Sequence, residues 1–451
     1  MAVLTEQQER LLAFLATGIY SAPEIQQRFR CSQPTVSRLL APLADRVCLI
    51  GKARSRRYSR LRDLRGLGGV FPVFCIDADG NARQTGTLSA VAQHDFLWRP
   101  EGDHEQLFKS LPWFLADLHP EGFVGRAFVR QCHHELGLPP RSNDWNEDHT
   151  LIALVRRGED TVGNLVVGQE SLERYFRLVQ SDMPALPAAA RAAVYPQLAQ
   201  EALEGQPVGS SAGGEQPKFT TVLEHEGGTR AVLVKFSPQR DSEEGQRWAD
   251  LLLCEHHTLQ TVQQAGIAAA ASRVLEAGGR LFLEVDRFDR HGRHGRLPVI
   301  SLRAVENEFY GYQDNWVNAA NRMEKDGRLS MQDAASLRWL SVFSSLIANN
   351  DQHFGNVSLV MPSAARLYSL APGYDLLPML YRPQDGSVPA RCFVPPVAVP
   401  GASGEWASAF DSACLFWERA QADERISAPF RQICLANRET LERLKTAPRL
   451  L

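Results

Sequence analysis

The sequence predicts an α+β protein of several domains. Segments with apolar residues at helical spacing and segments with strand-like alternation are mixed along its 451 residues, a length typical of about two to four domains. The first 62 residues hold eleven Lys and Arg against four Asp and Glu, a formal charge of +7, whereas the remainder carries −10. A small basic unit in front of a larger acidic body is therefore expected, and the basic unit is the part suited to a polyanion.

The composition gives no sign of export or membrane insertion. The sequence holds no uninterrupted apolar run of the ~18 residues that a membrane span needs, and its first residues lack a signal-peptide pattern. The eight cysteines are scattered and form no C-x-x-C pair. We therefore expect a cytoplasmic protein with reduced thiols and no membrane contact.

Residues 1–65 predict three short helices followed by a β-hairpin. Helical patterns begin after Thr5, after Ser21 and within "CSQPTVSRLLAPL", and "VCLIGKARSRRYSRL" alternates on both sides of a turn-like break. This order is typical of a winged helix-turn-helix DNA-binding domain; a small helical dimerisation or docking module with a solvated basic face is the alternative. The residues expected to meet DNA are Gln33, Thr35, Ser37 and Arg38 on the third helix and Lys52, Arg54, Arg56 and Arg57 at the hairpin tip.

Residues 70–205 mix strand-like and helical segments. Strands are predicted in "GVFPVFCIDADGNARQTGTLSAVA", with a turn at Asp79-Gly80-Asn81, and also in "HTLIALV" and "GNLVVG". A helix is predicted in "HEQLFKSLPWFLADL". The Ala- and Pro-rich residues 183–207 predict a helix-bearing connector.

A Gly/Ser-rich segment, residues 209–218, precedes two predicted strands, "FTTVLE" and "RAVLVKF". The N–H groups of such a segment can cradle phosphates, but it matches no standard phosphate-loop motif, so a mobile loop is the alternative. Lys235 ends the second, strongly apolar strand, where a lysine is expected only if its charge has a partner. A triphosphate would be such a partner; a carboxylate or an exit to solvent are the alternatives.

Asp351 and Asn356 lie in "NNDQHFGN", directly after an apolar segment that predicts a buried helix. Their D-x-x-x-x-N spacing is that of the protein-kinase catalytic loop, where the aspartate accepts the proton of the substrate hydroxyl and the asparagine carbonyl ligates Mg²⁺. Asp375 has the place of the second metal-binding carboxylate. The spacing alone occurs often by chance, but the order Gly-rich loop, strand lysine, catalytic loop and metal aspartate indicates phosphoryl transfer.

In their order, "SSAGGEQPK", "LVKF", "VDRFDR", "NNDQHFGN" and "PGYDLLP" resemble the motifs of the HipA family. These are bacterial Ser/Thr kinases, the toxins of toxin–antitoxin and persistence modules. The resemblance, over about residues 70–440, implies a bilobal protein-kinase-like fold behind the winged helix-turn-helix domain of residues 1–65. It implies a subdomain at 70–205, N-lobe elements at 206–300 and a helical C-lobe at 301–451. It also implies ATP and Mg²⁺ as cofactors and a protein substrate, plausibly an aminoacyl-tRNA synthetase by family analogy, whose phosphorylation inhibits growth.

The resemblance also implies roles for single residues. Asp351 would be the catalytic base, with His353 supporting its loop or the phosphates. Asn356 and Asp375 would ligate the metal, and Lys235 would bind the α- and β-phosphates. The other implied ATP-binding residues are Asp286 and Phe288 of the adenine hinge, Tyr374 packed nearby, and Ser211, Ala212, Gly213 and Gly214 of the loop. Autophosphorylation of Ser210 or Ser211 would eject that loop and silence the kinase, because a dianionic phosphoserine repels ATP phosphates.

The sequence departs from the family pattern in three places. The loop reads Glu215-Gln216-Pro217-Lys218, the hinge acid is Asp286 where the family has glutamate, and the helix-turn-helix is fused. In the family the antitoxin partner is usually a separate DNA-binding protein. The fusion therefore predicts a kinase that carries its own regulator, which argues against the need for an antitoxin; a homodimer stays open.

Two other classes of function remain as alternatives. One is a transcriptional regulator whose kinase-like body only senses a nucleotide or a partner, and the other is a small-molecule kinase fused to a helix-turn-helix. The intact Asp351, Asn356, Asp375 and Lys235 favour the protein kinase over the regulator, because a pure sensor does not need the base.

Overall fold

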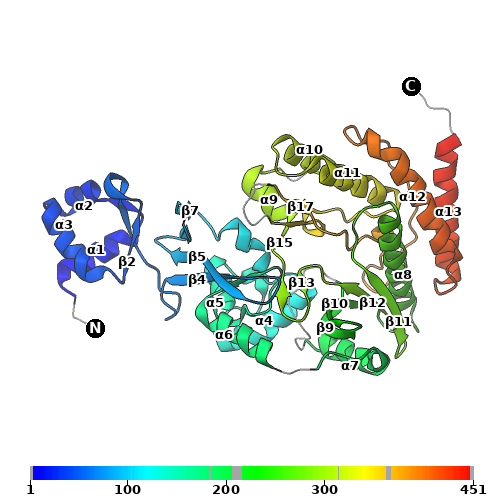
Figure 1. The fold of residues 1–451 in the computed structure, drawn as a ribbon, viewed down its shortest axis with the longest axis horizontal. Coiled ribbons are helices and arrows are strands. Elements are labelled where there is room, and N and C mark those ends of the chain that lie inside the picture. The colour runs from blue at the N-terminus through cyan, green and yellow to red at the C-terminus, as the bar shows by residue number, and fades with distance from the viewer. Residues whose placement is uncertain are drawn as a thin grey trace.

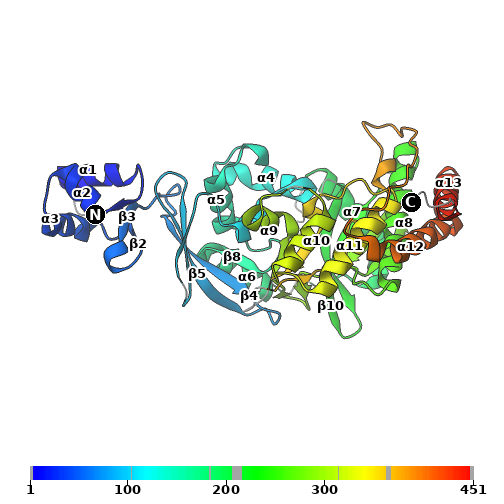
Figure 2. The ribbon, with the colours of Figure 1, turned by 90° about the horizontal axis from the view of Figure 1, so that it is seen from above.

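The computed structural model describes residues 4–102, 104–181, 184–205, 216–312, 314–361 and 367–446, and its mixture of helices and sheets confirms the predicted α+β class. The molecule is elongated, with a small N-terminal unit at one end, a sheet with its helices next, and the largest part at the other end (Figure 1). Figure 2 shows the same order from above. In the described ranges, no helix combines the length and the apolar character that crossing a membrane requires.

The N-terminal unit, residues 4–62, contains three helices and a three-stranded antiparallel sheet of order β1-β3-β2. Thr5 accepts a hydrogen bond from the N–H of Gln8 and caps the first helix, as the sequence predicts. Leu11, Leu15 and Val36 are fully buried where the helices meet. The elements are α1 (Glu6–Leu15), β1 (Tyr20–Ser21), α2 (Ala22–Phe29), α3 (Gln33–Leu40), β2 (Val47–Ile50) and β3 (Arg57–Arg60).

The middle unit, residues 63–181, is built on a five-stranded antiparallel sheet of order β7-β6-β5-β4-β8. Its first turn is the one predicted at Asp79-Gly80-Asn81, because the Asp77 carboxylate accepts hydrogen bonds from the N–H groups of Asp79 and Asn81. The elements are β4 (Val70–Ile76), β5 (Ala82–Ala90), β6 (Phe96–Pro100), β7 (Gln106–Phe108), α4 (Gly122–Leu136), α5 (Glu147–Arg157), β8 (Leu165–Val167) and α6 (Gln169–Gln180).

Two predicted elements of the middle unit are wrong. The expected strand "HTLIALV" lies inside α5, where all residues from Thr150 to Val155 are buried. A helix buried on nearly all sides shows no amphipathic period, so its sequence looks like a buried strand. The expected helix "HEQLFKSLPWFLADL" is instead strand β7 followed by a 3₁₀ turn, Trp113–Leu118, that begins after Pro112.

Polar and apolar contacts dock the N-terminal unit on the middle unit. Arg62 forms an ion pair with Asp148 at 2.6 Å. The hydroxyl of Ser59 accepts a hydrogen bond from the N–H of Ala92 at 3.0 Å. Beside these bonds, residues 48, 91 and 97 form a small buried apolar cluster. The two units therefore form a continuous packed contact.

A four-stranded antiparallel sheet of order β11-β12-β10-β9 forms the strand-rich part, with the long helix α8 packed against it. The predicted strands "FTTVLE" and "RAVLVKF" are present within β9 and β10, and β12 ends at Asp286. The predicted connector contains α7. The elements are α7 (Arg191–Leu203), β9 (Lys218–His225), β10 (Gly228–Phe236), α8 (Glu243–Gln264), β11 (Ser272–Ala277) and β12 (Arg280–Asp286).

The remaining residues form the C-terminal helical part, whose buried residues share the largest apolar core of the described chain with α8. A small sheet of order β15-β16-β17 joins its first helix to the strand after "NNDQHFGN". The elements are β13 (Arg290–His291), β14 (Gly295–Arg296), β15 (Val299–Ser301), α9 (Leu302–Phe309), α10 (Trp316–Lys325), α11 (Met331–Leu346), β16 (Ser358–Val360), β17 (Ser369–Leu370), α12 (Ser403–Ala422) and α13 (Ala428–Thr446).

Candidate active site

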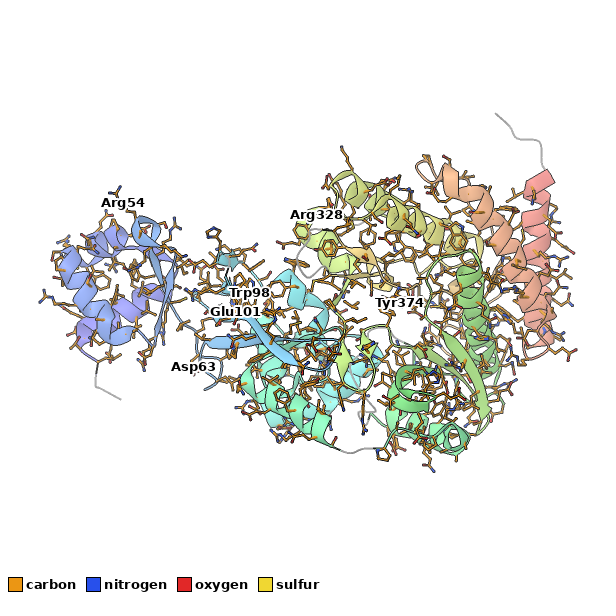
Figure 3. The ribbon with its side chains drawn as sticks, viewed as in Figure 1. Arg54, Asp63, Trp98, Glu101, Arg328 and Tyr374 are labelled. Atoms are coloured by element: carbon orange, nitrogen blue, oxygen red, sulfur yellow. The ribbon has the colours of Figure 1, made fainter. Side chains whose placement is uncertain are left out.

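A cavity of about 230 Å³ lies where the strand-rich part, the C-terminal helical part and the middle unit meet. Segments far apart in the sequence line it, and they include many of the residues singled out from the sequence. The predicted site residues that line it are Lys235, Asp286, Phe288, His353, Asn356, Tyr374 and Asp375. Figure 3 labels Tyr374 in the interior of the largest part of the molecule.

Lys235 is buried at the end of β10 and bridges two carboxylates. Its Nζ donates to Oε1 and Oε2 of Glu255, at 2.7 and 2.8 Å, and to Oδ1 of Asp375 at 2.7 Å. Burial alone would lower the pKa of Lys235, but the charges of Asp375 and Glu255 outweigh it, and the pKa is raised. The ammonium therefore stays charged, and its partners in the described structure are the carboxylates that the sequence left as an alternative.

Glu255 is a site residue that sequence reasoning missed. It is fully buried on α8, and burial raises its pKa against the opposing charge of Lys235. A signal was present, because a glutamate directly after the apolar stretch Leu251–Cys254 must find a cation if it is ionised.

Asp375 holds an unusual backbone conformation beside the cavity. Its φ of 56° places a non-glycine residue in the left-handed region, which costs about 1 kcal/mol or more and is concentrated at functional sites. Burial would raise the pKa of Asp375, but Lys235 and Lys218 outweigh that effect and lower it. The carboxylate is thus ionised, and it stays 24% exposed.

The loop after α11 holds Asp351 and Asn356 by internal hydrogen bonds. The side-chain Nδ2 of Asn356 donates to the carbonyl of Asp351 at 2.9 Å, so its Oδ1 turns the other way. The N–H of Asp351 donates to Oδ1 of Asn349 at 3.0 Å. Asp351 is half-buried and does not line the cavity itself. The loop therefore presents the Asn356 oxygen, a hard donor of the kind Mg²⁺ prefers, with a carboxylate five residues away.

Two neighbours brace this loop. Gln352 accepts a hydrogen bond from the hydroxyl of Ser341 at 3.1 Å and donates to the hydroxyl of Ser345 at 2.8 Å, so it ties the loop to α11. The indole Nε1 of Trp316 donates to the carbonyl of His353 at 3.2 Å. The loop is therefore held from both sides, which fixes the position of Asp351.

Asp286 and Phe288, which the sequence predicts as hinge residues, also line the cavity. The ring of Phe288 lies 5.4 Å from that of Tyr374, and the Tyr374 hydroxyl donates to the carbonyl of Gly355 at 3.1 Å. The Asp286 carboxylate accepts a hydrogen bond from Arg230 at 2.5 Å. The Asp286 carboxylate is thus already paired with a cation of the protein.

Comparisons with known proteins agree with this geometry. The family model for the HipA-like C-terminal domain matches residues 210–438, and that for the middle domain of YjjJ-like toxins matches residues 67–176. The protein named Toxin YjjJ, from Escherichia coli strain K12, is 37% identical over 439 residues, 96% of this chain and 98% of its own.

The chain belongs to the HipA-like family.

Solved structures add the fold. A chain of the complex of HipA, HipB and operator DNA from Shewanella oneidensis MR-1 matches at a TM-score of 0.50 and 15% identity, over 84% of this chain and 100% of its own. The proinflammatory kinase CtkA of Helicobacter pylori matches at 12% identity and a TM-score of 0.35, over 52% of this chain and 90% of its own. The match to the HipA chain, together with the family model, shows the HipA-like fold for the body of the chain.

In this HipA-like chain the middle unit also reaches the cavity, which sequence reasoning missed. Asp117, His119, Glu121 and Val162 line it, together with Lys218 and Arg303 from the two other parts. The residues of the middle unit follow no kinase motif, and nothing in the sequence indicates that they reach this cavity. The predicted loop residues Ser210, Ser211, Ala212, Gly213 and Gly214 lie outside the described residues.

The residues predicted to meet DNA lie apart from the cavity, on the N-terminal unit of this HipA-like chain. Gln33, Ser37 and Arg38 are exposed on α3, and Thr35, half-buried, accepts a hydrogen bond from Arg38 at 3.3 Å. The hairpin tip between β2 and β3 exposes Lys52, Arg54, Arg56 and Arg57. Figure 3 labels Arg54 on this unit, far along the molecule from Tyr374.

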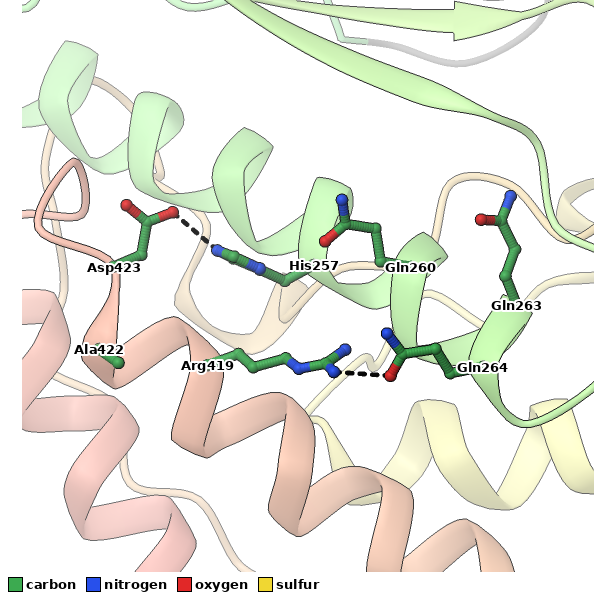
Figure 4. A pocket seen from close by; sticks show the side chains of 7 residues that line it. All are labelled: His257, Gln260, Gln263, Gln264, Arg419, Ala422 and Asp423. Carbon is green, nitrogen blue, oxygen red and sulfur yellow. Dashed lines mark hydrogen bonds and ion pairs between the residues drawn. The ribbon is translucent and has the colours of Figure 1, made fainter.

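A second cavity of about 700 Å³ lies between α8 and α12 (Figure 4). His257 bonds to Asp423 at 2.7 Å, and Arg419 donates to Gln264 at 2.6 Å. His257 is two residues beyond Glu255 on the same helix, so these bonds lie on another face of α8. They brace the helix that holds the partner of Lys235.

Proposed function

We propose that this chain is an ATP-dependent serine/threonine protein kinase, a HipA-type toxin that inhibits growth by phosphorylating a protein. The observation that carries the proposal is the bridge of Lys235 to Glu255 and Asp375 inside a cavity that the Asn356 loop also lines. A bilobal kinase-like arrangement would place these groups around a triphosphate.

The residues present fit ATP and Mg²⁺. Among the described residues, no group of three or more His, Cys, Asp or Glu side chains could hold a metal ion by itself. A site made of the Asp375 carboxylate and the Asn356 oxygen suits Mg²⁺, which takes its other ligands from water and phosphates. Bound Mg²⁺ would neutralise charge on the phosphates during transfer.

Each residue then has a separate task. Lys235 would hold the phosphates while Glu255 keeps its ammonium in place. Asp351, whose carboxylate takes no hydrogen bond from another described residue, would accept the proton of the substrate hydroxyl. The braced loop would align that hydroxyl with the phosphate, which supplies much of the rate of such enzymes.

The proposal extends to the substrate and to regulation. The substrate would be a protein hydroxyl, plausibly on an aminoacyl-tRNA synthetase by family analogy alone. Phosphorylation of Ser210 or Ser211 would repel ATP phosphates and silence the enzyme. The relative from Escherichia coli is named a toxin, which supports a toxic function for this chain as well.

We also propose that the N-terminal unit is a winged helix-turn-helix domain that binds DNA and regulates the chain's own expression. Three short helices, a sheet that carries the hairpin, and four exposed cations at its tip support this. These charges would contact phosphates, while Gln33 and Arg38 would reach base edges.

The test is γ-phosphate transfer by the purified full chain, its Asp351→Ala variant, and Asp241→Ala as a matched control at an exposed carboxylate. We expect labelled protein with the wild type and the control, and retained ATP binding without labelling for Asp351→Ala. ATP and DNA binding without transfer by the wild type would favour a regulator instead. Phosphate on a metabolite and none on protein would favour a small-molecule kinase.

A further inference from the structure

One wall of the candidate nucleotide cavity comes from the middle unit, and its acidic groups are all occupied. Asp117 accepts hydrogen bonds from the N–H and the hydroxyl of Ser301, at 2.6 and 2.7 Å. Glu121 accepts one from Arg303 at 2.9 Å. These bonds fasten the wall to the start of α9, so its geometry is fixed before a ligand arrives.

His119 lies in this wall, and its Nδ1 lies 2.8 Å from the hydroxyl of Thr150. That hydroxyl also lies 3.2 Å from the carbonyl of Asn146, one turn back along α5. When the single hydrogen of the hydroxyl bonds to this carbonyl, its oxygen accepts from Nδ1 of His119. In this arrangement the proton of His119 is on Nδ1.

The imidazole of His119 is also neutral at physiological pH. Burial lowers its pKa, and although the charge of Glu121 raises it, the nearby cation Arg303 lowers it again. A neutral ring with its proton on Nδ1 leaves a bare lone pair on Nε2. His119 is thus a hydrogen-bond acceptor in the cavity wall.

His353 has the opposite arrangement in the same cavity. Its Nδ1 accepts a hydrogen bond from the N–H of Gly355 at 3.1 Å, so its proton is on Nε2 and it can donate. A donor suits phosphate oxygens, whereas a bare lone pair repels them. His119 therefore needs a ligand group with an O–H or N–H.

The protein already engages the carboxylates that line the cavity. Each carboxylate lining the described part of the cavity already accepts a hydrogen bond from the protein. These carboxylates are Asp117, Glu121, Glu255, Asp286, Asp289 and Asp375. Among the described residues, no hydrogen bond is made to Nε2 of His119 or to Oδ1 of Asn356, so both are neutral side-chain acceptors in the cavity.

We propose that Nε2 of His119 accepts a hydrogen bond from the nucleoside of bound ATP, from a ribose hydroxyl or from the adenine amino group. His119 then determines nucleotide specificity, and the middle unit is part of the nucleotide site. This inference rests on the proposed kinase function, and it names a residue outside every kinase motif of the chain.

The test measures nucleotide affinity of the full chain without turnover. ATP is compared with 2′-deoxy-ATP, 3′-deoxy-ATP and inosine triphosphate, which lack one candidate donor each. The variants are His119→Phe, which keeps an aromatic ring against Trp145, His119→Gln, which restores an acceptor, and His134→Phe as a matched control on α4.

We expect the wild type to bind one of the three analogues about three- to tenfold more weakly than ATP, the usual effect of one hydrogen bond. His119→Phe should weaken ATP binding by the same factor, and it should no longer discriminate against that one analogue. His119→Gln should restore part of the ATP affinity and part of the discrimination. His134→Phe should bind all four nucleotides as the wild type does. Nitrogen NMR of the nucleotide-free chain should show His119 protonated on Nδ1.

The inference is overturned if His119→Phe binds ATP and all three analogues as the wild type does, or if the proton of His119 is on Nε2. In those cases ATP binding by the wild type would leave the proposed kinase standing. A wild-type chain that binds no ATP would overturn both.

Discussion

Two buried clusters of ion pairs meet at the same cavity, and they differ in how completely the protein satisfies them. Asp289 accepts hydrogen bonds from Arg287, from Arg290 and from the N–H of Gly163, and it is 7% exposed. Asp375 is 24% exposed and bonds to Lys235 at the cavity. We call the Asp289 cluster closed, because its carboxylate is nearly buried among protein donors, and the Asp375 cluster open, because its carboxylate stays partly exposed at the cavity. The closed cluster stabilises the fold, whereas the open one keeps a charged oxygen for a ligand.

The closed cluster also has a clear place in the fold. Arg290 reaches across to the middle unit, where it donates to Asp160 at 2.8 Å and to the carbonyl of Thr161 at 2.7 Å. Burial would raise the pKa of Asp289, but Arg287 and Arg290 lower it far below its usual range. The cluster therefore joins the middle unit to the segment after β12.

The largest expected effect comes from breaking the open cluster. Asp375→Asn should lower the rate of phosphate transfer by at least about 10³-fold, since a metal-binding charge contributes several kcal/mol to transition-state stabilisation. Single-turnover transfer measures it, with Asp411→Asn, an exposed carboxylate on α12, as the control. If Asp375→Asn kept the wild-type rate, Asp375 would have no role in phosphate transfer.

Breaking the closed cluster should lower the stability of the fold. Asp289→Asn should reduce the free energy of unfolding by about 3–5 kcal/mol, because it leaves two buried arginines without their shared carboxylate. Denaturant unfolding followed by circular dichroism measures this loss. Asp411→Asn removes only the ion pair with Lys445, and both side chains of that pair are exposed. Its free energy of unfolding should therefore fall by less than about 1 kcal/mol. Equal losses in the two variants would contradict the distinction between closed and exposed pairs.

A smaller effect should appear with pH. The folded-state pKa of Asp289 lies below its unfolded value, so its contribution is complete above about pH 4 and is lost as the pH falls toward the folded-state pKa. The difference in unfolding free energy between the wild type and Asp289→Asn should therefore shrink by up to about 1.4 kcal/mol per pH unit below about pH 4. A difference that stays constant from pH 7 to pH 3 would show that the Asp289 carboxylate is not ionised by its arginines.

Charges outside both clusters should have the smallest effect. Arg54→Ala at the exposed hairpin tip should leave stability and transfer unchanged and reduce the slope of log affinity for DNA against log salt by about 0.9. Fluorescence anisotropy at several salt concentrations measures the slope. Arg382→Ala, at an exposed arginine of the C-terminal helical part, serves as the control and should leave the slope intact.

The sequence could predict the residues of the candidate site because they stand in short motifs. Asp351 and Asn356 share one loop, and Lys235 is conspicuous at the end of an apolar strand. The HipA-like fold of the body follows from the same motifs. The strands around Asp79-Gly80-Asn81 also follow, because turn chemistry is local.

The remaining features depend on long-range packing. Glu255 becomes a partner of Lys235 only because α8 packs on the sheet, and Asp117 meets Ser301 across 184 residues. α5 was predicted as a strand because its burial on nearly all sides hides the helical period, although Asn146 at its N-terminus was a visible cap. Local patterns cannot show which distant surface will cover a segment.

The bonds between Asp117 and Ser301 have a consequence for protein engineering. The middle unit supplies part of the cavity, so it cannot be exchanged independently of the C-terminal helical part that it contacts through Ser301. Transplanting residues 216–446 into another protein would leave one side of the cavity open to water. Recombination between relatives would have to exchange the middle unit together with α9, and the partners of this contact are expected to change as a pair.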